Sequence, residues 1–270
     1  MLKNNPKKYL NKLHISQVQL ASHQQVEYLY CLGAGKIDNI VILIHGISRN
    51  AKEIITSFNK VTDKNTILIA PIFSKEYASD YQRLGRKNKG PRADYILQAI
   101  VNELKEKYKF SCDKLNLFGF SAGAQFAHRY AFAHPADVNK VAIVAAGWYT
   151  MPAFNLDYPI GLKLQDEFAD INFELKRLLR TKFRVYIGEQ DCQRDKSLNK
   201  NKRIDALQGK NRLERAKSWI TLMNNQYSKH QINNQINLVT LPNVAHDFED
   251  ANNLAQLSTK VYNWFVEDSR

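Results

Sequence analysis

The chain has 270 residues, 44% of them hydrophobic, which is enough for one large core and ordinary for a globular enzyme. Its 39 basic and 26 acidic residues give a net charge of +13, and its three cysteines show neither a disulfide framework nor a zinc-binding spacing. Because no run is long enough to span a membrane and the lysine-rich start has no apolar signal core, we expect a cytoplasmic protein with a single domain over residues 1–270.

Predicted strands, rich in apolar and β-branched residues, alternate with helical segments after a polar lead-in over residues 1–25. The strands are expected at residues 26–30, 40–45, 66–71, 115–118, 140–145, 183–187 and 237–241. The helices are expected at residues 51–61, 91–109 and 124–130. This alternation predicts an α/β fold with a mostly parallel central sheet and helices on both faces.

A G-x-S-x-G pentapeptide occupies residues 119–123, between an apolar strand and a helical pattern. A sharp turn from a buried strand into a helix strains the backbone of the serine and lifts its hydroxyl above the sheet edge. Glycine is needed at both flanking positions because side chains would clash in so tight a turn. The pattern therefore predicts Ser121 as a nucleophile, and the alternative is a glycine-rich turn with an incidental serine.

A serine hydroxyl is a weak nucleophile that needs an adjacent base, and the base needs a group that orients it. His246 lies in a loop just past the strand at residues 237–241, and Asp191 follows the strand at residues 183–187. The order serine, aspartate, histidine is one that Ser-His-Asp triads use. We therefore expect His246 as the base and Asp191 as the carboxylate.

Other residues compete for these two roles. The acid could instead be Asp195, further into the loop, or Glu189, closer to the strand. Asp247 adjoins the histidine but would have to fold back on its own neighbour. Of the other six histidines, His128 and His134 fall on the helix after the pentapeptide, where packing or capping explains them.

Acyl transfer also needs two backbone N–H donors aimed at the developing oxyanion. Ala122, directly after the serine, is expected to supply one. The buried strand at residues 40–44 ends in His45-Gly46, and Ile47 just beyond is expected to supply the other. His45 itself is expected to brace this loop.

Together these residues resemble the α/β-hydrolase superfamily over roughly residues 26–270. The resemblance is carried by His45-Gly46, the pentapeptide around Ser121, residues 188–191 and His246. A bacterial branch related to polyester depolymerases and feruloyl esterases is the most similar, through residues 45–51, 81–86, 90–94 and 146–150. The resemblance implies the α/β-hydrolase fold and ester-type chemistry, but no particular substrate.

Two segments interrupt the alternation of strands and helices. Residues 148–181 are expected to form a small lid, and Trp148 and Tyr149 at its start are candidates for the substrate-pocket wall, with packing under the lid as the alternative. Residues 192–211 are polar and basic and are expected to form a loop over the site.

Basic residues gather in two segments. Residues 83–92 carry five basic residues and no acid, and residues 193–217 carry nine basic and three acidic ones. Such segments can steer an anionic substrate, with Arg83 as a candidate contact, or can be a solvated basic surface. Specific nucleic-acid-binding modules have recognisable signatures, and the sequence contains none.

We therefore expect a serine hydrolase that cleaves a small carboxylic ester through an acyl-enzyme and requires no metal or organic cofactor. A thioester, amide or lactone would use the same triad. A catalytically silent binding protein on the same fold is the alternative outside catalysis. The sequence does not predict the oligomeric state.

Overall fold

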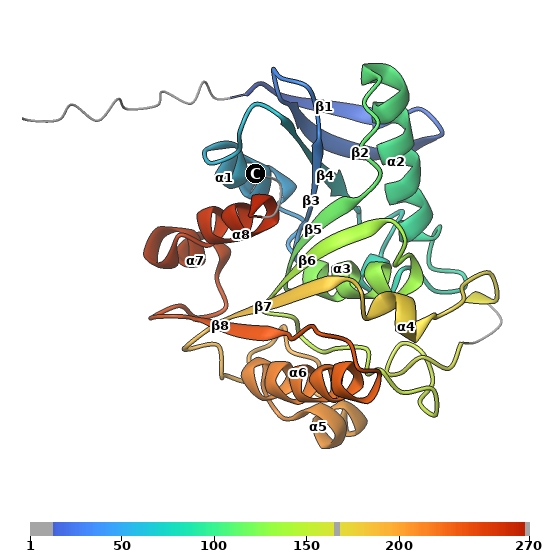
Figure 1. The fold of residues 1–270 in the computed structure, drawn as a ribbon, viewed down its shortest axis with the longest axis vertical. Helices are drawn as coiled ribbons and strands as arrows, with labels where there is room; N and C mark the ends of the chain where they lie inside the picture. The colour runs from blue at the N-terminus through green and yellow to red at the C-terminus, as the bar shows by residue number, and fades with distance from the viewer. Residues whose placement is uncertain (1–12, 165–167, 268–270) are drawn as a thin grey trace, which may run out of the picture.

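The computed structural model describes residues 13–164 and 168–267, which form an eight-stranded sheet covered by helices (Figure 1). The strands follow the order β1-β2-β4-β3-β5-β6-β7-β8 across the sheet. Strands β1 and β4 are each antiparallel to β2, and every other neighbouring pair is parallel. The strands are β1 (Ile15–Leu20), β2 (His23–Leu32), β3 (Asn39–Ile44), β4 (Thr66–Ile72), β5 (Leu115–Phe120), β6 (Val138–Val144), β7 (Lys182–Gly188) and β8 (Asn237–Leu241).

Helices cover both faces of the sheet, as the alternation of segments predicted. The helical elements are α1 (Ala51–Asn59), η1 (Tyr81–Arg83), α2 (Ala93–Tyr108), α3 (Ala122–Ala133), α4 (Leu175–Leu178), α5 (Lys202–Gln208), α6 (Arg212–Lys229), α7 (Phe248–Ala255) and α8 (Leu257–Val266). Helices α1, α7 and α8 pack on one face, and α2, α3 and α6 on the other (Figure 1).

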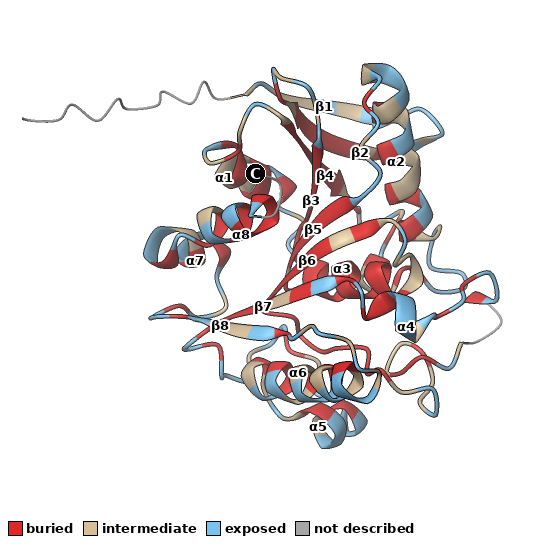
Figure 2. Cartoon of the chain, viewed as in Figure 1, coloured by how far each residue is buried: buried red, intermediate tan, exposed pale blue. Residues whose placement is uncertain are grey.

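Strand β3 illustrates why the parallel strands read as continuous apolar runs. All six of its residues are buried, and the central strands are buried along most of their length (Figure 2). Alternate side chains point to opposite faces of a strand. Ile42 therefore joins the core under α2 and α3, whereas Val41 and Leu43 join the core under α1 and α8. A strand buried on both faces therefore has an almost continuous apolar run, and the one polar residue of β3, Asn39, is hydrogen-bonded to Thr66.

Strand β1 and the start of β2 lie within residues 1–25, which the sequence suggested to be a polar lead-in, so that expectation is wrong for residues 15–20 and 23–25, and residues 1–12 lie outside the described residues. Strand β1 is at the edge of the sheet, pairs only with β2 among the described strands, and has an irregular register between Gln19 and Leu20. An edge strand with polar residues facing solvent has no continuous apolar run. Its sequence therefore gives only a weak signal for a strand.

The structure does not show the lid expected over residues 148–181. Within the described part of this segment, α4 is the only α-helix, and several side chains join the main core instead. These buried side chains include Tyr149, Met151, Tyr158, Leu162 and Phe168. Apolar burial accounts for these aromatic side chains, whereas Phe154 in the same segment is 53% exposed, and the lid stays a prediction.

Within the described residues, no helix combines the length and the apolar character that a bilayer crossing requires. The assignment of the whole chain to a single domain stays a prediction.

Candidate active site

Ser121 lies in the sharp turn between β5 and α3, with φ of 56° and ψ of −111°. A residue other than glycine rarely adopts a backbone conformation with positive φ. A Cβ atom on Gly119 would lie 2.2 Å from the carbonyl oxygen of Gly123, and one on Gly123 would lie 2.2 Å from that of Ile44. The two flanking glycines are therefore required by the tightness of the turn, as the pentapeptide predicted.

Three side chains from distant parts of the chain form a hydrogen-bonded row. The Oγ of Ser121 lies 3.0 Å from Nε2 of His246, and Nδ1 of His246 lies 2.8 Å from Oδ2 of Asp191. A carboxylate can only accept, so Nδ1 carries the proton and Nε2 is free to accept from the serine hydroxyl. The structure thus brings together the three residues that the sequence placed in one site.

The loop that carries His246 is attached to the end of β7. The N–H of Glu189 donates to the carbonyl of Leu241, and that of Gln190 to the carbonyl of Val244, both at 2.9 Å. A Cβ atom on Gly188 would lie 2.2 Å from the Val244 carbonyl oxygen. The close backbone contact at Gly188 therefore fixes the His246 loop against the end of β7. Asp191 follows this strand end along the chain.

The other candidate acids have different partners in the structure. Asp195 accepts hydrogen bonds from Arg212 and from Ser197. Glu189 accepts from the backbone N–H of Asn243, and Asp247 accepts from the N–H of Asp250 at the start of α7. Among the described carboxylates, Asp191 is the one hydrogen-bonded to His246.

The loop after β3 lies directly against the serine. A Cβ atom on Gly46 would lie 3.6 Å from Cβ of Ser121, and Ile47 lines the same cavity as Ser121. Ala122 is the first residue of α3, so its N–H has no acceptor one turn earlier in the helix. Within the described residues, the N–H of Ile47 has no hydrogen-bond partner either. The two amides that the sequence suggested are both adjacent to the nucleophile and unpaired.

His45 braces this loop from inside the core, as expected. Its Nδ1 donates to the carbonyl of Gly46 at 2.9 Å, and its Nε2 accepts from the N–H of Phe73 at 3.0 Å. The hydroxyl of Tyr81 donates to the carbonyls of both His45 and Gly46. Burial lowers the pKa of His45 to about 4, so the ring is neutral at physiological pH and can keep this donor and acceptor pattern.

Arg212 is a site residue that the sequence analysis missed. Its buried guanidinium donates to Oδ1 of Asp191 at 3.0 Å, to Oδ2 of Asp195 at 2.6 Å and to Oγ of Ser197 at 2.6 Å. The hydrogen bond from Arg212 holds the pKa of Asp195 well below its usual range. The only sequence signal was one more arginine in a basic segment, and that signal says nothing about its partner.

A cavity of about 230 Å³ opens beside the nucleophile. Both apolar and polar residues line this cavity, including Ser121 and His246. The lining residues are Gly46, Ile47, Ser48, Asn50, Glu53, Ile54, Phe120, Ser121, Ser197, His246, Asp247 and Phe248. Ser197 comes from the segment at residues 192–211, so this segment reaches the site as the sequence suggested, although part of it forms α5.

Trp148, Tyr149 and Arg83, the expected substrate contacts, do not line this cavity. The Tyr149 ring is fully buried and stacks on Trp219, with 5.0 Å between the ring centroids. The Trp148 ring lies 4.1 Å from the guanidinium carbon of Arg129, and Arg83 approaches the same ring at 5.8 Å. Packing explains the position of Tyr149, and substrate contact by the three residues stays a prediction.

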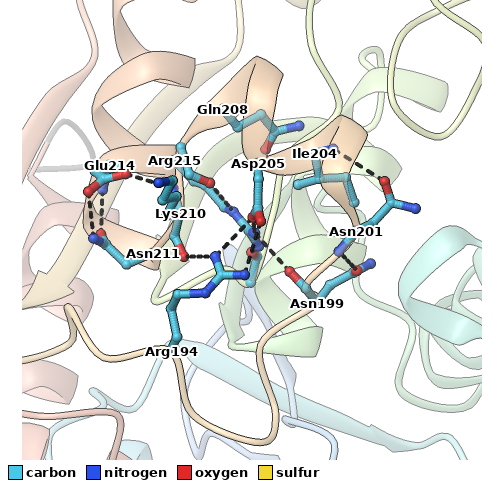
Figure 3. A network of polar contacts seen from close by, with 12 residues as sticks. Arg194, Asn199, Asn201, Ile204, Asp205, Gln208, Lys210, Asn211, Glu214 and Arg215 are labelled. Atoms are coloured by element: carbon cyan, nitrogen blue, oxygen red, sulfur yellow. Dashed lines mark hydrogen bonds and ion pairs between the residues drawn. The ribbon is translucent and has the colours of Figure 1, made fainter.

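Three of the nine basic residues in residues 193–217, Arg194, Arg212 and Arg215, form ion pairs within the protein. Figure 3 shows Arg194 and Arg215 converging on Asp205, with nitrogen-to-oxygen distances of 3.0 and 2.7 Å. Arg215 also donates to the carbonyl of Gly147. In the other basic segment, residues 83–92, Arg86 and Arg92 form ion pairs with Asp80 and Asp94, respectively. These arginines hold loops together.

Within the described residues, no three His, Cys, Asp or Glu side chains are grouped so that they could hold a metal ion. The three cysteines are free thiols, and only Cys31 is buried.

Comparison with solved structures finds the same fold in proteins of low sequence identity. Poly(3-hydroxybutyrate) depolymerase LpqC from Bordetella parapertussis is 21% identical, with a TM-score of 0.73 over 95% of this chain and 91% of its own. Poly(aspartic acid) hydrolase-1 from Sphingomonas sp. KT-1 is 19% identical, with a TM-score of 0.70 over 87% of this chain and 92% of its own. The fluorophosphonate-binding serine hydrolase FphF from Staphylococcus aureus is 12% identical, with a TM-score of 0.61 over 94% and 98%. Searches with protein-family models and with curated protein sequences found no match.

Proposed function

We propose that this chain, whose fold is that of the α/β-hydrolases, is a serine hydrolase that cleaves a carboxylic ester of a small molecule. One observation carries the proposal: an unbroken row of hydrogen bonds joins Ser121, His246 and Asp191 at a strained turn beside a cavity. Strained backbone conformations cluster at functional sites, and a nucleophilic serine requires an adjacent base. A serine with only a structural role requires neither.

In the proposed acylation step, His246 removes the hydroxyl proton of Ser121 as Oγ attacks the ester carbonyl. Asp191 holds the imidazole in the required tautomer and stabilises the imidazolium that forms. The N–H groups of Ile47 and Ala122 donate to the oxyanion of the tetrahedral intermediate. The imidazolium then gives its proton to the departing alcohol, and an acyl group remains on Ser121.

Deacylation runs through the same groups. Water replaces the alcohol, loses a proton to His246 and attacks the acyl carbonyl, and Oγ of Ser121 leaves with the proton that the histidine returns. The products are a carboxylic acid and the free serine. Because protein groups perform every proton transfer, the proposed reaction requires no cofactor.

The same arrangement would serve a thioester, an amide or a lactone, and a silent binding protein on this fold is the alternative outside catalysis. The solved structures with this fold include proteins that are named as an esterase and as a dienelactone hydrolase. The cytoplasmic location remains a prediction.

Labelling with a fluorophosphonate, which reacts with activated serines, separates catalysis from silent binding. We expect one covalent adduct on Ser121 in the wild-type chain and none in Ser121→Ala. A panel of nitrophenyl esters, nitrophenyl thioesters, anilides and lactones, compared by kcat/KM, then identifies the acyl substrate. No adduct together with no turnover of any panel member would contradict the proposed function.

A further inference from the structure

The charged side chains that line the cavity beside Ser121 are both acidic. Glu53, from the first turn of α1, and Asp247, directly after His246, belong to the lining. Among the described residues, no lysine or arginine does. This local charge is opposite to the net charge of +13 of the whole chain.

The guanidinium groups nearest to this cavity are occupied elsewhere. Arg49 donates to the backbone carbonyls of Phe73 and Ile47, and so lies across the back of the loop after β3. Arg212 is buried against Asp191 and Asp195. Neither arginine belongs to the lining of the cavity.

The groove next to the cavity differs in charge. This outer groove, of about 670 Å³, shares Asn50 and Glu53 with the cavity and continues between α1 and α7. Lysine and glutamate side chains both line it, namely Lys52, Lys60 and Glu249. Charge of one sign is therefore a property of the inner cavity, next to the nucleophile.

Helix N-termini reduce the negative charge but do not cancel it. The caps of α1, α3 and α7 are Asn50, Ser121 and Asp247, and all three line the cavity. A helix N-terminus acts as roughly half a positive charge. The three N-termini together therefore contribute less positive charge than the two carboxylates contribute negative charge. The charges of Asp247 and Glu249 act on Glu53: burial and then these two neighbours raise its pKa.

We propose that the substrate carries a positive charge, as an ammonium or guanidinium group, on the part that occupies this cavity, where Glu53 and Asp247 determine the specificity. The proposal rests on the proposed serine hydrolase function and narrows its substrate class. It differs from the anionic substrate that the basic segments could steer, and three arginines of these segments, Arg86, Arg92 and Arg194, pair with Asp80, Asp94 and Asp205.

Matched esters test the charge directly. One series has nitrophenyl esters with acyl chains of equal length that end in a trimethylammonium, a tert-butyl or a carboxylate group. A second series compares acetate esters of choline and of 3,3-dimethylbutanol, which place the same two shapes on the alcohol. In at least one series we expect kcat/KM for the cation to exceed that for the neutral isostere by about tenfold, since partly exposed charge pairs contribute modestly. The carboxylate ester is expected to be the slowest.

Salt and variants locate the effect. The preference should shrink in about 1 M salt, where the screening length falls to roughly 3 Å. Glu53→Gln and Asp247→Asn should each lower the ratio of cationic to neutral kcat/KM severalfold. Both amides keep an oxygen acceptor for the cap contacts, and thermal melting checks the fold of each variant.

Asp113→Asn is the matched control. This exposed carboxylate lies before β5, at the end of the strand opposite to Ser121, and the substitution removes one negative charge far from the cavity. The ratio of cationic to neutral kcat/KM should stay at the wild-type value in this control.

Three outcomes would overturn the proposal: equal kcat/KM for cation and isostere in both series, faster cleavage of the carboxylate ester, or an unchanged ratio in both cavity variants. Failure of the proposed function itself looks different. In that case Ser121 takes up no fluorophosphonate and neutral esters are not cleaved, whereas a labelled enzyme without charge preference contradicts only the substrate class.

Discussion

Arg212 donates to Oδ1 of Asp191 while His246 donates to Oδ2, so the two oxygens of one buried carboxylate have different partners. The same guanidinium holds Asp195 and Ser197, and Ser197 lines the cavity beside Ser121. Arg212 thus connects the acid of the proposed triad with the loop at the mouth of the site. We regard it as a positioning residue.

Replacing Arg212 tests this connection. Arg212→Met leaves Asp191 with an unpaired oxygen, and we expect the unfolding free energy to fall by about 3–5 kcal/mol, as when one partner of a buried ion pair is removed. At a temperature where the variant remains folded, kcat should fall by about 10²-fold, because small misplacement of a catalytic group is costly.

If Arg212 had a purely structural role, Arg212→Met and Arg212→Lys would have the same kcat once the loss of folded protein is corrected for. Arg212→Lys keeps the charge and should recover part of kcat, whereas Arg194→Met, which breaks the ion pair of an exposed arginine with Asp205, should leave kcat near the wild-type value. If Arg212→Lys and Arg212→Met have the same kcat and KM, Arg212 does not act through the charge at Asp191.

The strained backbone at Ser121 predicts a separation between stability and activity. Both Ser121→Ala and Ser121→Gly should lower ester turnover by at least about 10³-fold, the scale of losing a triad member. Ser121→Gly should have the larger unfolding free energy of the two, by about 1–2 kcal/mol, because glycine adopts the left-handed region without strain. Denaturant unfolding of both variants measures the difference, and equal stabilities would contradict the role of backbone strain.

Gly188 should be intolerant of a side chain. A methyl group there would meet the carbonyls of Val244 and Ala245 at 2.2 and 2.8 Å, so Gly188→Ala must push away the loop that carries His246. We expect a loss of about 1–3 kcal/mol in stability and a larger relative loss in kcat. Gly147→Ala is the matched control, since its nearest neighbour, the Gln125 side chain at 3.0 Å, can move. Comparable effects of the two substitutions would argue against a special role for Gly188.

Acid should destabilise the fold through its buried imidazoles. Burial lowers the pKa of His45 to about 4, and burial also lowers the pKa of His128. The unfolded chain takes up protons near pH 6.5, so the unfolded state binds more protons than the native state below that pH. The stability that neutral His45 contributes is therefore present above pH 6.5 and declines as the pH falls toward about 4.

The measurement is the unfolding free energy at pH 7 and pH 5 for the wild type and for His45→Gln. The variant should be less stable at pH 7 because it loses hydrogen bonds to Gly46 and Phe73, but its decline between the two pH values should be smaller. Part of the decline remains because His128 is still present. An identical decline in both proteins would mean that His45 is not held neutral by the fold.

The sequence predicted those parts of the site that depend on local geometry. The turn at Ser121 needs glycines on both sides, and a pattern of five residues records that need. His246 and Asp191 each follow a strand, and parallel strands bring their carboxyl ends to one edge of the sheet. The turn pattern and the loops after these strands were therefore enough to predict one common site, although Glu189 and Asp195 fit the same chain order as the acid.

The sequence could not predict contacts that are set by packing between distant elements. Arg212 contacts Asp191 because α6 packs against β7. The sequence of a basic segment does not show which of its arginines is buried. For Tyr149 the sequence left the pocket wall and packing open, and its ring stacks on Trp219 of the same helix α6. The acidic lining of the cavity comes from residues 53 and 247, which only the folded sheet brings together.

Mass spectrometry of the enzyme during turnover of a slow activated ester tests the central claim most directly. The claim predicts an acyl group on the peptide that contains Ser121, formed within the first turnover in the wild type and absent in both Ser121→Ala and His246→Ala. An acyl group on any other residue, or ester turnover that persists at the wild-type rate in Ser121→Ala, would contradict it.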